Sequence, residues 1–180
     1  MRFKLIYKGQ VKINPKKRTQ HINKIRMVIS EQLKNLYEID PYSDLKKLMT
    51  KTPGKPSIIR TVGGVDFISL ISPEMNFLAE INMQLLVPEL TTTPRADIDN
   101  RMKTLLDALR RPQDSHEVAQ GVDKTQPVYT LLDDDKYVSE LTINTSHLLD
   151  QSGDEDEVLV IISVGLRATK ATQQNFNFLI

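Results

Sequence analysis

Two carboxylates and an ammonium group lie at helical spacing in the middle of the chain. Asp99, Lys103 and Asp107 are each four residues apart, so a helix would place them along one face. Asp97 stands where a helix N-cap belongs. An apolar stripe marks another face of the same helix, formed by Ile98, Met102, Leu105, Leu106 and Leu109. The segment therefore gathers acidic and basic groups at the positive end of a helix, beside a buried stripe.

A second acidic segment consists of the consecutive residues Asp133, Asp134 and Asp135. It follows apolar residues and precedes a strand-like run over 136–145. Adjacent carboxylates repel one another unless a cation or water neutralises them. If the two segments lay side by side, they would form an oxygen-lined site suited to a hard divalent metal.

Together the two segments resemble the RusA family of Holliday junction resolvases. The family pattern reads Arg-x-Asp-x-Asp-Asn-x-x-Lys-x-x-x-Asp-x-Leu, followed by Asp-Asp-x-x-Val. It is matched by Arg95, Asp97, Asp99, Asn100, Lys103, Asp107, Leu109, Asp134, Asp135 and Val138. The resemblance covers about residues 85–145. It implies an endonuclease that depends on Mg²⁺ and acts as a homodimer on branched DNA such as the four-way junction.

The resemblance also implies that Asp97, Asp99, Lys103 and Asp135 are catalytic. Hydrolysis of a phosphodiester needs an activated water and neutralisation of the charge that develops on the phosphate. Carboxylates alone repel the phosphate, but they can hold Mg²⁺ or Mn²⁺, which polarises the substrate. Lys103, one turn beyond Asp99, would bond a phosphate oxygen or the leaving group.

The predicted metal ligands are Asp97, Asp99, Asp134 and Asp135. Asp134 is either a ligand or a partner of one. Asn100 and Asp107 fit structural roles better, and Asp133, which has no counterpart in the pattern, is expected to be local solvated charge. Taken alone, Asp-x-Asp-Asn at a helix start is more often capping chemistry than a metal site. The lysine at i+4, the later Asp-Asp-x-x-Val and the basic first third of the chain together favour the site.

Charge is distributed unevenly along the chain. Residues 1–60 contain fifteen Lys or Arg and four Asp or Glu, a net charge of +11, whereas the remainder carries −10. This asymmetry predicts a polyanion-binding surface, although solvated surface charge is the alternative. The predicted DNA-binding residues are Lys16, Lys17, Arg18, Lys24, Arg26 and Arg95. The N-terminal third does not match the family pattern, so none of its DNA contacts is transferred from the family.

Composition sets wider bounds. With 180 residues and a hydrophobic fraction of 39%, the chain is expected to form one domain over 1–180. Without cysteine it has neither a disulfide framework nor a thiolate zinc site. No apolar run is long enough to cross a bilayer and no signal-peptide pattern opens the chain, so a cytoplasmic protein without membrane contact is expected.

Hydrophobic periodicity predicts an α+β fold, with a mixed or antiparallel sheet and about two main helices packed on it. Strands are expected at 1–13, 57–62, 65–71, 76–88, 136–145 and 158–166. The first is lysine-rich and is expected at a sheet edge, and Gly63-Gly64 predicts a hairpin turn between the second and third. The last is nearly continuous and β-branched, which is typical of a strand buried on both faces. Helices are expected within 14–38, in a short stretch of 39–56 and up to Leu109. The polar connection 112–130 is interpreted as a tolerated insertion or a mobile loop, and 150–157 as an acidic turn.

Two other functions stay open at this level. The chain could be a nucleic-acid-binding protein without catalytic activity, in which the acidic residues serve structure or bridge Mg²⁺. It could also be a metal-dependent phosphoesterase for a small substrate, which would need a deep pocket.

Overall fold

Seven strands and two α-helices form the frame of the described residues. The computed structural model describes residues 1–12, 15–88, 95–149 and 157–178, with backbone only at 95–97. The helices are α1 (Arg18–Leu36) and α2 (Arg95–Leu109). The strands are β1 (Arg2–Gln10), β2 (Ile59–Val62), β3 (Val65–Ile71), β4 (Phe77–Val87), β5 (Val128–Leu132), β6 (Val138–His147) and β7 (Glu157–Ala168). Single 3-10 turns or short 3-10 helices are η1 (Tyr42–Leu48), η2 (Pro73–Met75), η3 (Ser115–Glu117), η4 (Asp135–Tyr137) and η5 (Phe176–Phe178).

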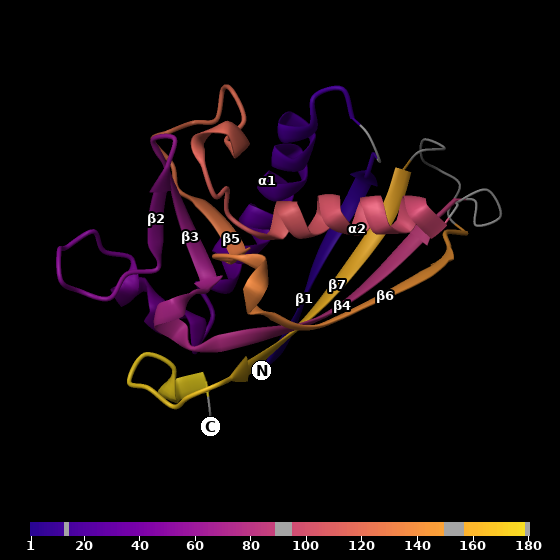
Figure 1. The fold of residues 1–180 in the computed structure, drawn as a ribbon. Coiled ribbons are helices and arrows are strands. Elements are labelled where there is room, and N and C mark those ends of the chain that lie inside the picture. Colours follow the sequence, from indigo (N-terminus) through magenta and orange to yellow (C-terminus); the bar gives the residue numbers. More distant parts are fainter. Residues whose placement is uncertain (13–14, 89–94, 150–156, 179–180) are drawn as a thin grey trace.

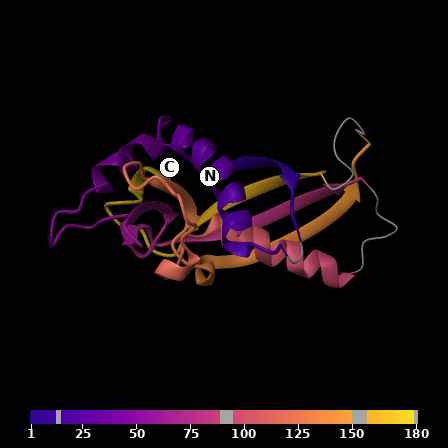
Figure 2. The ribbon, with the colours of Figure 1, turned by 90° about the horizontal axis from the view of Figure 1, so that it is seen from above.

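The strands form two mixed sheets. The larger has the order β1-β7-β4-β6, in which β7 is antiparallel to both neighbours and β6 is parallel to β4. The smaller has the order β2-β3-β5, with β3 antiparallel to β2 and parallel to β5. The two sheets occupy opposite ends of the molecule (Figure 1; Figure 2). The predicted α+β class is confirmed, although two sheets replace the one that was expected.

The alternating sequence of β4 explains its place in the larger sheet. Its odd-numbered side chains, among them Ile81, Met83 and Leu85, are buried, while its even-numbered ones are half-buried or exposed. β1 alternates in the same way and lies at the sheet edge, as its position and lysines predicted. One face of the sheet therefore packs into the core.

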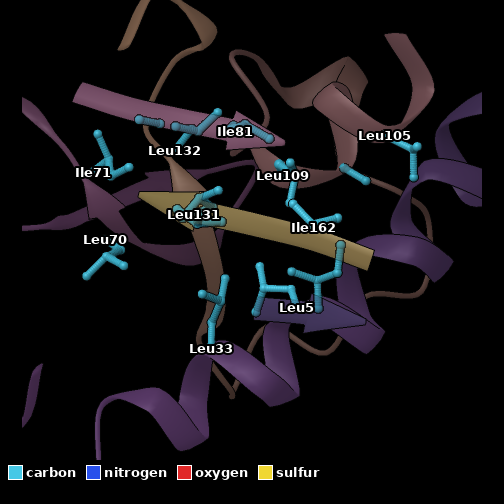
Figure 3. Close-up of a cluster of buried hydrophobic side chains, with 14 of the residues drawn as sticks. Leu5, Leu33, Leu70, Ile71, Ile81, Leu105, Leu109, Leu131, Leu132 and Ile162 are labelled. Atoms are coloured by element: carbon cyan, nitrogen blue, oxygen red, sulfur yellow. The ribbon is translucent and has the colours of Figure 1, made fainter. Parts of the chain in front are cut away.

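Both α-helices cover that face. Ile25, Ile29 and Leu33 of α1 are fully buried, as are Leu105 and Leu109 of α2. These side chains meet the inward residues of the sheet in one hydrophobic core, which Figure 3 shows around Leu5, Leu131 and Ile162. Burial of this continuous apolar surface is the main driving force for the fold.

The hairpin between β2 and β3 turns at Gly63 and Gly64. Both glycines have positive φ, 58° and 82°, which is the requirement of a two-residue type I′ turn. Gly63 also lies against Val118, which would crowd a Cβ at 3.1 Å. The sequence prediction of this hairpin is confirmed.

Three predicted elements differ from the structure. β5 begins at Val128, inside the stretch 112–130 that was expected to be a connection, because Val128 packs with Val65 and Phe67 in a small satellite core. The short helix predicted within 39–56 is the 3-10 helix η1. β7, expected to be buried on both faces, is buried only at its even-numbered positions Val158 to Val164.

The end of the described chain docks on the body. Phe178 is buried, and its ring lies 5.3 Å from the rings of both Tyr42 and Phe77. The predicted acidic turn lies, except for Glu157, outside the described residues. Among the described helices, none is both long and apolar enough to cross a membrane.

Candidate metal and nucleic-acid site

The first half of α2 presents the predicted Asp99 and Lys103 to solvent. Both side chains are exposed, while Thr104, Leu105 and Ala108 are fully buried. Asp99 and Lys103 are four residues apart, a rise of about 6 Å along the helix, so one phosphate group could lie beside both. The side chains of Arg95 and Asp97, two other predicted site residues, lie outside the described part of the chain.

Asp107, nearer the C-terminal end of α2, is held by two arginines. Its carboxylate accepts hydrogen bonds from Arg18 at 2.8 Å and from Arg110 at 2.9 Å. Arg110 also donates to Glu117 at 2.8 Å, and this bond is the main reason that the pKa of Arg110 is raised. Asp107 thus has the structural role that the sequence indicated.

The prediction that Arg26 contacts DNA is wrong. Its side chain is 2% exposed, and its guanidinium donates to the backbone carbonyl oxygens of Asp107 at 2.6 Å and Arg110 at 3.2 Å. Carbonyl oxygens at the C-terminal end of a helix receive no hydrogen bond from a backbone N–H of the same helix. The Arg26 guanidinium supplies the missing donors, and its positive charge also suits this end of the helix dipole. Burial, followed by the nearby charge of Arg110, lowers the pKa of Arg26 to about 10.

Asp133 is not the solvated charge that was expected. It is buried, and its carboxylate receives a two-pronged bond from Arg111, with distances of 2.5 and 3.3 Å. Its backbone N–H donates to Ile71 at 2.8 Å, which continues the pairing of β3 with β5. Arg111 directly follows α2, so this ion pair fastens the end of the helix to the end of β5.

Asp134 and Asp135 form the turn η4 between β5 and β6. Asp134 caps this turn, accepting the backbone N–H of Lys136 at 3.0 Å, and this bond is the first cause of its lowered pKa. Lys136 also places its ammonium 3.8 Å from the same carboxylate. The Asp135 side chain is exposed.

The two acidic segments lie at opposite ends of α2 within one chain (Figure 1). Arg110 forms a bridge with Leu132, so η4 is next to the helix C-terminal end, whereas Asp99 is ten residues, or about 15 Å, from that end. Strand pairing in the larger sheet also places η4 far from the start of α2. Val138, which follows η4, pairs with Ala79 at the start of β4, whereas α2 begins after the end of β4.

The described side chains accordingly contain no group of three or more His, Cys, Asp or Glu that could hold a metal. Asp97, whose side chain is not described, belongs with Asp99 by position. The shared site of Asp97, Asp99, Asp134 and Asp135 stays a prediction, and inside one chain it would have to span most of α2.

Four exposed lysines surround a hollow between the end of β1 and the start of α1. The hollow, which we call the basic hollow, has a volume of about 720 Å³. Its lining consists of Tyr7, Gln10, Lys12, Pro15, Lys16, Lys17, Gln20, His21 and Lys24. The structure therefore brings together three of the predicted DNA-binding residues, Lys16, Lys17 and Lys24. Arg18 is adjacent in sequence but is shared with Asp107.

The positive charges around the basic hollow affect the protonation of His21. Its Nε2 accepts the backbone N–H of Lys12 at 3.0 Å, so the ring is neutral at that nitrogen. Partial burial lowers the pKa of His21, and the charges of Lys12, Lys24 and Arg18 lower it further.

Sequence reasoning missed Lys12, His21 and Arg111 as parts of these sites. Lys12 was included in the strand predicted at 1–13, whereas β1 ends at Gln10 and Lys12 lies just after it. Arg111 did carry a signal, because an arginine directly before Pro112 follows the last turn of a helix. Its partner Asp133 could not be identified without the fold.

Comparisons with protein-family models, with curated proteins and with solved structures find no match for this chain. The resemblance to RusA therefore rests on the residues of the motif themselves.

Separating the roles of the three consecutive aspartates is a direct test of this geometry. Asp133→Ala should lower the free energy of unfolding by about 2–4 kcal/mol, because the largely buried Arg111 would lose its ion-pair partner. The double variant Arg111→Met/Asp133→Leu should recover most of this loss, and Asp135→Ala should change stability by less than about 0.5 kcal/mol. Urea denaturation measures all three. An unfolding free energy for Asp133→Ala equal to that of Asp135→Ala would contradict the buried pair.

The lowered pKa of His21 makes folding sensitive to acid. The unfolded chain takes up the proton more readily than the folded chain, so the stabilising effect of neutral His21 is complete above about pH 6.5 and is lost as the pH falls through the lower folded value. His21→Gln can still accept the Lys12 N–H but does not titrate. Urea unfolding between pH 7.5 and 5 should show a steeper loss of stability for the wild type than for the variant. If stability depended on pH in the same way in the wild type and in the variant, the pKa of His21 would not be lowered by folding.

Proposed function

We propose that this protein is an endonuclease that depends on Mg²⁺, or on Mn²⁺ in its place, and cleaves branched DNA such as the Holliday junction as a homodimer. The observation that carries the proposal is the arrangement of the motif on α2. Its Leu105 and Leu109 are buried, and its Asp99 and Lys103 reach solvent one turn apart. A carboxylate and an ammonium group in this order suit a metal-bound phosphodiester.

The donor chemistry around Asp99 fits a magnesium ion. Mg²⁺ is commonly held by one or two carboxylates while it keeps several waters, so Asp97 and Asp99 would suffice as protein ligands. When bound, the ion would polarise the phosphate and activate a water. Asp99 is exposed, so an ion could reach it without rearrangement of the core. Within one chain Asp134 and Asp135 are too far along α2 to join this pair.

Residues of the chain itself would position the substrate. Lys103 would donate to a phosphate oxygen or to the leaving group, and its place on a rigid helix with a buried opposite face fixes where that bond forms. The lysines of the basic hollow would hold the DNA backbone, since ammonium groups near a helix N-terminus attract phosphates. A homodimer would provide two such sets for paired cuts on a symmetric junction.

One observation favours the alternative of a nucleic-acid-binding protein without catalytic activity. Asp133 is committed to Arg111 and Asp134 to the η4 turn, and both lie at the opposite end of α2 from Asp99. If the predicted ligands Asp97, Asp99, Asp134 and Asp135 only stabilise the fold, the basic hollow would still bind DNA. The two functions differ in whether the bound junction is cut.

Asp99→Asn tests the catalytic proposal. Cleavage of a synthetic four-way junction in Mg²⁺ should fall by about a hundredfold or more, because an amide cannot replace a carboxylate ligand, while junction affinity stays within about threefold. Glu31→Gln, on the exposed side of α1, is the matched control and should cleave like the wild type. EDTA should stop the wild-type reaction. A wild type that binds junctions but cuts none in Mg²⁺ or Mn²⁺ would establish the alternative function.

Salt dependence tests the basic hollow. The logarithm of the DNA association constant should fall linearly with the logarithm of salt concentration, and each lysine that contacts phosphate should contribute about 0.9 to the slope. Lys17→Ala/Lys24→Ala should therefore reduce the slope by about 1.8, while the exposed Lys55→Ala should leave it unchanged. Fluorescence anisotropy with labelled duplex measures it. Equal slopes for the wild type and the double variant would rule out the hollow as the DNA contact.

A further inference from the structure

The larger sheet has a second face that no described helix covers. α1 and α2 both lie on the face that contains Ile81 and Ile162, and the opposite face is bare in Figure 1. Strand register identifies the side chains of this open face, because neighbours in register point to the same side. They belong to the even-numbered residues of β1, β4 and β6 and to the odd-numbered residues of β7.

The open face carries one apolar patch, which is bordered by the polar residues Lys8, Ser163 and Gln84. Ile6 of β1 is 50% exposed and lies opposite Ile161 of β7, and Leu159 lies opposite Leu86 of β4. A sheet face that meets water normally carries polar side chains at such positions. Adjacent aliphatic residues on three neighbouring strands therefore form a contiguous patch of the kind that marks an interaction surface.

Charges at one end of the open face are separated by sign. In one row of the sheet, Arg2 on β1 is followed by Gly165, Glu80 and Glu140 on β6. Glu80 and Glu140 are direct neighbours in register, so their like charges repel. Lys4 adds a second cation on the β1 side. Within the described part of the chain, none of these four charged side chains has an ion pair or a side-chain hydrogen bond.

A hollow of about 530 Å³ lies between the two charged groups, where Gly165 has no side chain. Arg2 and Lys4 border it on one side, and Glu80 and Glu140 on the other. Glu80 Oε2 is 3.3 Å from where a Cβ on Gly165 would be, so the glycine leaves this carboxylate accessible. The hollow can thus accept a long side chain of either charge from a partner.

We propose that the open face is the two-fold interface at which two copies of this chain meet. A two-fold axis parallel to the strands places the β1 edge of one copy over the β6 edge of the other. Arg2 and Lys4 then face Glu140 and Glu80 of the second copy, and the symmetry makes this pairing twice. The alternative axis, perpendicular to the strands, would set β1 over β1 and lysine against lysine. Because each face carries cations on β1 and carboxylates on β4 and β6, it is complementary to itself in charge.

The size of the face suits a reversible dimer. Four strands spaced about 4.8 Å apart and nine residues long, at about 3.3 Å per residue, cover roughly 600 Å² before side-chain relief is counted. That is somewhat below the roughly 800 Å² per partner of a standard stable interface. Association in the micromolar range is therefore expected. This inference rests on the homodimer of the proposed function and specifies its surface, but it does not depend on cleavage.

Complementary charge reversal tests the interface. Arg2→Glu/Lys4→Glu makes both edges acidic, and Glu80→Lys/Glu140→Lys makes both basic. Each variant alone should dimerise at least about tenfold more weakly than the wild type, whereas an equimolar mixture should form a heterodimer as tight as the wild-type dimer. Lys55→Glu/Lys124→Glu changes the net charge by the same amount as the first variant but lies away from the sheet face, so it should dimerise normally.

Sedimentation velocity from about 1 to 200 μM, without DNA or metal, measures these constants. Circular dichroism and thermal melting confirm that each variant is folded. A wild type that stays monomeric throughout this range would overturn the proposal. So would a dimer whose affinity is the same in both charge variants, a mixture that forms no heterodimer, or an equal loss in the control. Since the assay contains no junction, failure of this interface is distinct from failure of the nuclease proposal.

Discussion

The C-terminal end of α2 is the constraint on which the rest of the architecture depends. Arg26 from the core of α1 satisfies the last carbonyls of this helix, Arg110 binds Asp107 and Glu117, and Arg111 binds Asp133. Helix macrodipoles favour cations at this end, and here the cations also tie the helix to α1, to the connection after it and to β5. Loss of Arg111 would leave the buried carboxylate of Asp133 without its ion-pair partner.

Because these bonds fix the C-terminal end of α2 next to η4, they also fix the position of Asp99 near its other end. A straight helix of fifteen residues cannot bring Asp99 to η4, so the two acidic segments are separated by the same bonds that hold the fold together. The motif spacing in the sequence carries no information about this distance, because two segments joined by a connection and a strand can end anywhere relative to each other.

The sequence predicted most elements because their patterns are local. β4 alternates strictly between Pro73 and Pro88, and Gly63-Gly64 is a turn that few other residues allow. β5 was missed because its five residues, Val-Tyr-Thr-Leu-Leu, show no regular alternation, and only their contacts with β3 identify them as a strand. β7 was expected to be buried on both faces for the same reason, since nearly continuous β-branched sequence cannot reveal that one face lacks a cover.

Individual charges were less predictable than elements, because burial depends on what packs against them. Lys24 and Arg26 are two residues apart on one helix, yet Lys24 lines the basic hollow and Arg26 lies in the interior. The positively charged residues in excess among the first sixty residues therefore do not lie on a single surface.

Part of that excess is neutralised locally, since Lys46 pairs with Glu38 and Lys51 with Asp66. Of the remaining cations, Lys12, Lys16, Lys17 and Lys24 line the basic hollow, Arg2 and Lys4 lie on the open sheet face, and Lys55 lies on neither. A net charge counted along the sequence thus overstates any one binding surface. Once located in the fold, these cations fall on two separate surfaces, for which we propose different partners: phosphate at the hollow and carboxylates at the sheet.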